Sequence, residues 1–172
     1  MSRILFQLHV DIDARVSSIR SAHADWLCGK GCDSCCQHLA SIPLLVAEEW
    51  NLLREGLAAL PETQLAEISQ RMVVLATQQA RPFTCPFLDR ESGACPVYVQ
   101  RPVACRTYGF YVQRALGLYC GDIEAQVARG ERDDVVWGNQ DAIEHTLENL
   151  GERRELTEWF TLWRTGTAAA QG

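Results

Sequence analysis

Residues 28–38 read CGKGCDSCCQH and hold four cysteines within nine positions, Cys28, Cys32, Cys35 and Cys36. Thiolates are soft ligands that favour zinc, Cu(I) or iron–sulfur clusters over magnesium or calcium. Spacings of two or three residues let successive thiolates face one centre while the backbone turns, and the two interspersed glycines ease that turn. The stretch therefore predicts a soft-metal site around which the rest of the fold is organised.

The composition narrows the class of protein. A chain of 172 residues is expected to form a single domain, residues 1–172. The formal net charge of −6 argues against a nucleic-acid partner, which would need a basic surplus. The N-terminus lacks the long apolar run and cleavage site of a signal peptide, and no stretch is apolar enough to span a membrane. We therefore expect a cytoplasmic protein with no membrane partner.

Four more cysteines follow the opening cluster, Cys85, Cys95, Cys105 and Cys120. In a reducing compartment, clustered thiols indicate metal binding or catalysis rather than a disulfide framework. We therefore take all eight cysteines as candidate metal ligands. His38, two residues after the first cluster, is an alternative ligand that could replace one thiolate.

Helical hydrophobic spacing marks most of the remaining chain. A first helix is expected through Ile12 and Ile19 to Trp26, a second after Ser41, and a third from Pro61. Residues 143–163 predict two further helices broken around Gly151, with their aromatic residues in the core. These segments predict a mainly α fold, a small helical domain.

Residues 81–120 differ from the rest. They hold four prolines, show no sustained helical period, and place the turn sequence DRESGA between CPFL and CPVY. We expect an irregular loop and hairpin region that orders itself by binding metal, because metal binding contributes roughly 10–16 kcal/mol to folding in small zinc modules. The metal-binding core is thus expected at about residues 28–120.

The identity and number of the metals stay open at this point. Cys35 and Cys36 are adjacent, so both can face one small mononuclear site only with awkward geometry. A multinuclear cluster or two neighbouring sites accommodates them more easily. The Cys-Pro pairs at 85–86 and 95–96 are also found in ferredoxin ligand runs, whereas four thiolates also suit tetrahedral zinc. The expected cofactor is an iron–sulfur cluster or zinc.

The order of the cysteines resembles that of the YkgJ-type cysteine-cluster proteins, described as a zinc- or iron-chelating domain of the CxxCxxCC type. The resemblance is carried by CGKGCDSCC at 28–36, CPFL at 85–88 and CPVYVQRPVACRTY at 95–108. The positions that match the second half of the family pattern are Cys85, Cys95, Tyr98, Arg101, Pro102, Cys105, Arg106 and Cys120. One departure is the first spacing, three residues where the family has two.

The resemblance implies a protein that chelates a metal ion or cluster, and it settles no substrate or reaction; the function we expect is a redox or metal-handling role. Arg101 and Arg106 are candidate cofactor-binding residues, since they could donate hydrogen bonds to the sulfurs; equally, they could tie loop carbonyls together.

Two other functions remain open. Flagellin lysine N-methylases look similar in this segment, and Cys28, Cys32 and Cys35 have the spacing of radical enzymes that use S-adenosylmethionine. Against this reading, Ser34 stands where those enzymes carry an aromatic residue, and the chain is short for their barrel. Alternatively, zinc could stabilise a module for a protein partner. No catalytic residue is assigned.

Overall fold

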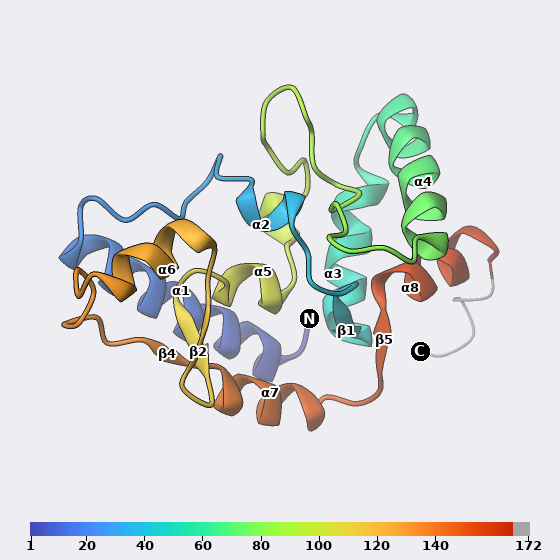
Figure 1. Cartoon of the computed structure of the whole chain (residues 1–172). Helices are drawn as coiled ribbons and strands as arrows, with labels where there is room; N and C mark the ends of the chain where they lie inside the picture. Colours follow the sequence, from blue (N-terminus) through green and yellow to red (C-terminus); the bar gives the residue numbers. More distant parts are fainter. Residues whose placement is uncertain (167–172) are drawn as a thin grey trace.

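The computed structural model describes residues 1–166 and is mainly helical, as expected (Figure 1). The α-helices of the described part are α1 (Arg3–Ala22), α2 (Ser34–Gln37), α3 (Ala47–Ala58), α4 (Glu62–Thr77), α5 (Val103–Thr107), α6 (Gly121–Ala128), α7 (Gln140–Glu148) and α8 (Leu156–Arg164). One 3-10 helix, η1 (Tyr98–Gln100), precedes α5. The strands are β1 (Leu44–Val46), β2 (Tyr111–Gln113), β3 (Leu116–Leu118), β4 (Gly138–Asn139) and β5 (Arg153–Glu155).

Local sequence explains the ends of the long helices. Ser2 caps α1, because its hydroxyl oxygen accepts a hydrogen bond from the Leu5 amide at 3.2 Å. Helix α1 ends at Ala22, so the expected extension to Trp26 is wrong. Pro61 is the N-cap residue of α4, which confirms the predicted start of that helix.

The strands form two small sheets. In one, β1 pairs antiparallel with β5, with Leu45 opposite Arg154. In the other, β2 lies between β3, its antiparallel hairpin partner, and β4, which runs parallel to it. The first sheet joins the segment after the cysteine cluster to the C-terminal part of the chain.

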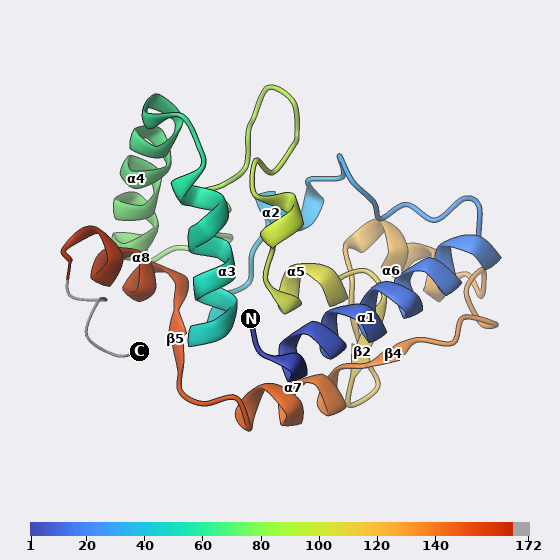
Figure 2. The ribbon, with the colours of Figure 1, turned by 180° about the vertical axis from the view of Figure 1, so that it is seen from behind.

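Two hydrophobic clusters form the core. The first cluster lies among α3, α4 and α8 and consists of Leu45, Trp50, Leu53, Leu57, Ile68, Met72, Leu75, Phe83, Phe87, Val97, Leu156 and Phe160. The second cluster lies among α1, α5 and α7 and consists of Leu5, Leu8, Ile12, Ile19, Val46, Val103, Phe110, Tyr111, Val135, Ile143 and Leu147. Figures 1 and 2 show the two groups of helices side by side, with α2 above and between them.

A short strand and a buried carboxylate join the clusters. Leu45 of β1 belongs to the first cluster and Val46 to the second. Glu49 of α3 is 3% exposed, and its carboxylate accepts hydrogen bonds from the Val103 amide at 2.8 Å and the Val46 amide at 3.1 Å. The start of α5 is thereby fixed against the start of α3.

The C-terminal pair of helices confirms the predicted break, since α7 and α8 flank β5 around Gly151. Trp159 and Trp163 pack against the first cluster, and the Trp159 indole donates to the Leu45 carbonyl at 2.9 Å. Core packing is therefore confirmed for this aromatic stretch.

The region at 81–120 is only partly irregular. The DRESGA turn forms, with the Asp89 amide donating to the Ala94 carbonyl at 2.9 Å. Beyond it, however, residues 103–107 form α5, and the β2–β3 hairpin follows. Pro102 explains α5, because a proline at a helix start loses no intrahelical hydrogen bond.

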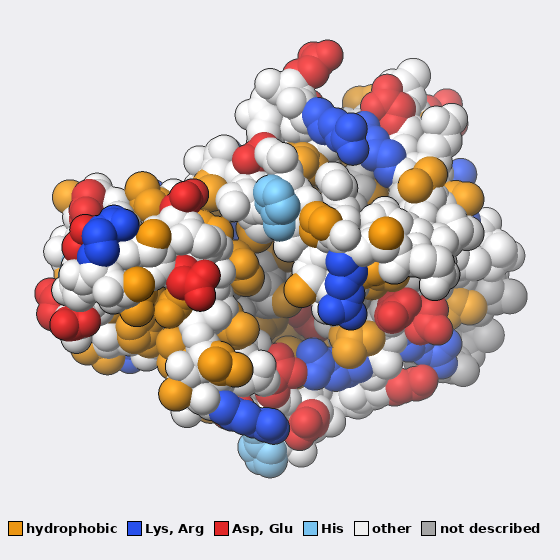
Figure 3. All heavy atoms as spheres, viewed as in Figure 1, with side chains coloured by type: hydrophobic (Ala, Val, Ile, Leu, Met, Phe, Trp, Pro, Cys, Tyr) orange, Lys and Arg blue, Asp and Glu red, His pale blue; other side chains and the backbone are white. Residues whose placement is uncertain are grey.

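The surface carries charges of both signs. Figure 3 shows basic side chains interspersed with acidic ones over the face turned to the viewer. No helix within residues 1–166 has both the length and the apolar character needed to cross a bilayer.

Candidate metal centre

Seven of the eight cysteines line one cavity of about 130 Å³ near α2. They are Cys28, Cys32, Cys35, Cys36, Cys85, Cys95 and Cys105. Cys85 and Cys95 pack against the first cluster, whereas Cys28 packs against the second. The cavity therefore lies where the two halves of the molecule meet, and it unites the two cysteine blocks of the sequence.

A chain of thiols crosses from one block to the other. The Cys36 thiol lies next to those of Cys35 and Cys85, close enough for each neighbour to shift its pKa. The backbone makes the same connection, since the Cys85 amide donates to the Cys36 carbonyl at 2.7 Å. The adjacent cysteines of α2 thus work together, with Cys36 facing the second block.

The protonation of these thiols reflects their crowding. The hydrogen bond to Cys36 and burial raise the pKa of Cys35. For Cys36, the bond from Cys35 lowers the pKa, but the bond to Cys85, burial and the nearby thiols raise it overall to about 12. Without a cation among them, these thiols are neutral at physiological pH.

Cys28 lies close to the end of α5. Its thiol donates to the Tyr108 carbonyl at 3.6 Å. Gly109 has a φ of +88°, and a Cβ placed there would stand 2.7 Å from the Cys28 sulfur, so only glycine fits. Burial, then the neighbouring Cys32, Cys35 and Cys120, raise the pKa of Cys28 to about 12, against the opposing charge of Arg20.

The eighth cysteine, Cys120, lies just outside this cavity as the N-cap residue of α6. It lines a separate groove of about 330 Å³ together with His38 and Tyr108. The Tyr108 pKa is raised by burial first and then by Cys35, Cys120 and Cys28. Tyr108 therefore stands between Cys120 and the other thiols.

The His38 ring hydrogen-bonds the Ser34 carbonyl at 3.0 Å and lies outside the seven-thiol cavity.

Arg101 and Arg106 both line the thiol cavity, but they donate their hydrogen bonds to backbone carbonyls and, from Arg106, to the Asp13 carboxylate, not to the thiols. Arg106, 8% exposed, donates to the carbonyls of Arg101 at 3.2 Å and Val99 at 2.7 Å. Arg101 donates to the Tyr98 carbonyl at 2.9 Å, and its guanidinium carbon lies 4.0 Å from the Tyr98 ring centroid. The structure thus shows both arginines tying the loop together.

The charge of Arg101 nevertheless reaches the sulfurs. Burial raises the pKa of Cys95, while the Val97 amide and the positive charge of Arg101 lower it. Arg101 can therefore stabilise thiolates electrostatically without bonding to them directly.

The cavity has the sulfur donors that a soft metal prefers, but its thiols are not arranged in a coordination geometry. Among residues 1–166, no three histidine, cysteine, aspartate or glutamate side chains are already grouped as a metal site. The thiols surround the cavity instead of converging on a point. Seven soft donors around one internal space are nevertheless the ligand type that zinc and iron–sulfur clusters require.

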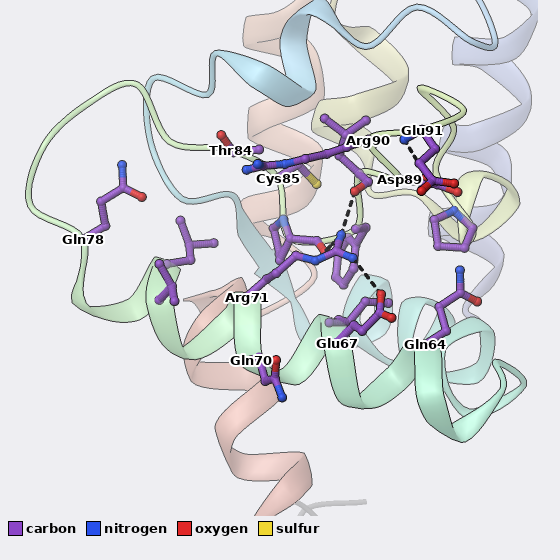
Figure 4. A pocket seen from close by; sticks show the side chains of 17 residues that line it. Gln64, Glu67, Gln70, Arg71, Gln78, Thr84, Cys85, Asp89, Arg90 and Glu91 are labelled. Atoms are coloured by element: carbon purple, nitrogen blue, oxygen red, sulfur yellow. Dashed lines mark hydrogen bonds and ion pairs between the residues drawn. The ribbon is translucent and has the colours of Figure 1, made fainter.

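A groove of about 770 Å³ lies outside the cysteine loop, between α4 and residues 84–91 (Figure 4). Arg71 of α4 reaches across it and donates to the Leu88 carbonyl at 2.7 Å and to Glu67 at 3.1 Å. Cys85 is the one cysteine in its lining, and Arg90 extends back towards it. Arg71 therefore holds the CPFL segment, and with it Cys85, against α4.

Sequence reasoning missed the roles of Tyr108 and Gly109. A glycine directly after an aromatic residue, close behind Cys105, could have indicated close backbone approach. The local sequence does not indicate that Cys28 is the residue approached by Gly109, because Cys28 lies 81 residues earlier in the chain.

Comparison with known proteins gives one match. The family model CxxCxxCC, described as a "Putative zinc- or iron-chelating domain", matches residues 27–134, which is more than half of the chain. No curated protein and no solved structure gives a significant match.

Proposed function

This chain belongs to the CxxCxxCC family of zinc- or iron-chelating domains, and from that membership we propose that the seven cysteines of the cavity, with Cys120 close by, hold a centre of more than one metal atom. The centre is an iron–sulfur cluster or a pair of zinc ions. The observation that carries the proposal is the cavity at the meeting point of the two halves, lined by seven thiols.

The size of the cavity favours more than one atom. Its volume is about 130 Å³, whereas one water-sized probe occupies roughly 10–15 Å³. The adjacent Cys35 and Cys36 favour the same conclusion, because one small tetrahedral site would use them together only with strain.

The protein's own contribution is to hold the thiols and release their protons. The pKa values of Cys28 and Cys36 are raised to about 12, so both thiols must lose a proton when a metal ion binds. Metal binding should therefore strengthen as the pH rises. Bound zinc or iron would supply charge to hold thiolates together, and an iron–sulfur cluster would add electron transfer. Arg101 and Arg106 keep the second cysteine block in position.

The test is to purify the full chain without oxygen and to assay metal, acid-labile sulfide and the absorption spectrum. Brown protein with sulfide identifies an iron–sulfur cluster, and colourless protein with two zinc ions identifies paired zinc. Cys36→Ser should lose most of the metal, whereas Ser34→Ala, on the same short helix, should keep it. A fully folded chain without metal, or with a single ion, would refute the proposal.

The other two functions gain little support. A radical enzyme would carry a parallel barrel, whereas the sheets of residues 1–166 have two and three strands. Absence of 5′-deoxyadenosine from the reduced protein would remove that alternative. A zinc-stabilised module for a protein partner would need an exposed docking face, and the aromatic side chains of Trp159 and Trp163 do not supply one, since they pack against the first cluster.

A further inference from the structure

An open groove of about 760 Å³ runs beside the thiol cavity, between α1 and the segment of η1 and α5. Figure 2 looks onto the molecule from the side where α1 lies in front. The groove and the cavity share six lining residues, among them Arg20, Lys30 and Arg101. A molecule in the groove would therefore touch the wall of the thiol cavity.

The groove is basic, although the chain carries a net charge of −6. Three arginines and the only lysine of the sequence line it, against the single carboxylate of Asp13. Asp13 is already paired, since Arg106 Nη1 lies 3.2 Å from both of its oxygens. Arg20 and Lys30 are exposed and have no ion pair or hydrogen bond within residues 1–166. Their positive charge is left without a partner.

Of the cations next to the thiol loop, Arg101 is held in place and Arg20 lies directly against the loop. Because Gly29 has no side chain, the Arg20 guanidinium lies against the loop, and a Cβ on Gly29 would stand 3.4 Å from Nη2. Arg101 is stacked on Tyr98. Donors that are already ordered lose less entropy when they bind an anion. Ser17 and Ser21, one helical turn apart on α1, add hydroxyl groups to the same lining.

We propose that this groove binds a small polycarboxylate anion of the citrate type. Guanidinium groups pair with carboxylates through two parallel hydrogen bonds, which favours a planar carboxylate. The groove also falls within the roughly 300–1,000 Å³ of small-molecule sites. A molecule with several carboxylates can contact Arg20, Lys30 and Arg101 together.

The position beside the thiols gives this anion a role, which rests on the proposed function. Polycarboxylates carry divalent metals through oxygen atoms, whereas soft metals prefer sulfur. A chelate held in the groove would present its metal to the thiol cavity. Each metal–oxygen bond given up is replaced by a metal–sulfur bond, and each thiol that binds releases one proton to solvent.

The experiment is calorimetric titration of the full chain, as purified and at low ionic strength, with citrate and separately with inorganic phosphate. The double variant Arg20→Gln/Lys30→Gln should weaken citrate binding about tenfold or more, as expected for lost charge-assisted hydrogen bonds. Arg164→Gln, an exposed arginine of α8, removes a charge elsewhere and should leave citrate binding unchanged. Thermal unfolding checks that each variant is folded, and metal assays before and after exclude stripping by citrate.

Each outcome decides the proposal. Absence of citrate binding to the wild type overturns it, because the cations would then only offset thiolate charge. Equal losses in the control variant, or phosphate binding as tight as citrate binding, also overturn it. Normal metal content in a double variant that no longer binds citrate supports the anion site but removes the delivery role, whereas reduced metal content in a folded double variant supports both. A wild type that binds citrate but holds no metal removes only the delivery role, together with the proposed function.

Discussion

The two hydrophobic clusters are built from similar side chains but differ in the polar groups buried with them. In the described chain, the helices of the first cluster bury two polar side chains, Glu49 and Thr157. The elements around the second cluster bury five, His9, Arg106, Thr107, Arg132 and Gln140. The first half is therefore stabilised almost entirely by apolar packing, whereas the second depends on buried charges whose partners lie at the surface.

The arginines of the second half show this dependence. Arg132 is 4% exposed and pairs at 2.8 Å with Asp25, which is largely exposed. Arg106 pairs in the same way with Asp13. A buried cation held by an exposed carboxylate is sensitive to pH and salt, so the second half should respond to conditions that leave the first unchanged.

The largest expected loss of stability comes from removing a core side chain of the first cluster. Trp50 is 2% exposed, with its ring centroid 6.3 Å from that of Trp159 and 6.1 Å from that of Trp163. Trp50→Ala should lower the free energy of unfolding by about 4 kcal/mol, measured by urea unfolding. The loss should be equal at pH 5 and pH 8. Val73→Ala, at a 67% exposed position on α4, should change little. A strongly pH-dependent loss would contradict the distinction between the halves.

The second-largest expected loss of stability comes from replacing Glu49, which connects the two halves. Burial raises the pKa of Glu49, while hydrogen bonds from the Val103 and Val46 amides lower it. Glu49→Ala leaves both amides without an acceptor and should cost about 3 kcal/mol of unfolding free energy. Glu49→Gln should cost less, because an amide oxygen still accepts one bond. Glu55→Ala, exposed on the same helix, is the control; a similar loss there would mean that helix propensity explains the effect.

The second half should weaken in acid. Burial, and then the charge of Arg106, lower the pKa of His9 from 6.5 to about 4. The unfolded chain binds this proton more tightly, so stability falls as the pH drops from about 6.5 to about 4, by at most about 3 kcal/mol. His9→Leu should flatten the pH dependence of unfolding over this range. His145→Leu, at an exposed position, should leave it as in the wild type.

The smallest effect lies where the thiol cavity meets the second half. Gly109→Ala forces an alanine to φ +88° and its Cβ against the Cys28 sulfur. It should cost roughly 1–2 kcal/mol and lower the metal content of the purified protein. Gly121→Ala is the matched control, since a Cβ there meets nothing within 4 Å. Unchanged metal content in the Gly109 variant would show that Cys28 is not needed.

The sequence predicts the long helices better than the short elements that organise the site. The start of α4 and the break between α7 and α8 follow from proline, glycine and helical spacing, which are local signals. β1, β5 and α5 have three to five residues, too few to show a period, and β1 pairs with a strand more than a hundred residues away. In the site, too, some features can be predicted from the sequence and others cannot. The two cysteine blocks are visible in the sequence, but the approach of Gly109 to Cys28 depends on tertiary packing.

The spread of the eight cysteines along the chain has a consequence during synthesis. Cys28 and Cys120 lie about 90 residues apart, and ribosomes add roughly 5–20 residues per second. Synthesis of the fourth cysteine, Cys36, therefore precedes synthesis of Cys120 by roughly 4–17 seconds. If the proposed centre forms, its first four cysteines are made before the other four, and a metal ion that reaches them in that interval meets only half of the thiols. Under the proposed function, the order of translation would thus let the free metal pool act on the first half of the site before the second half exists.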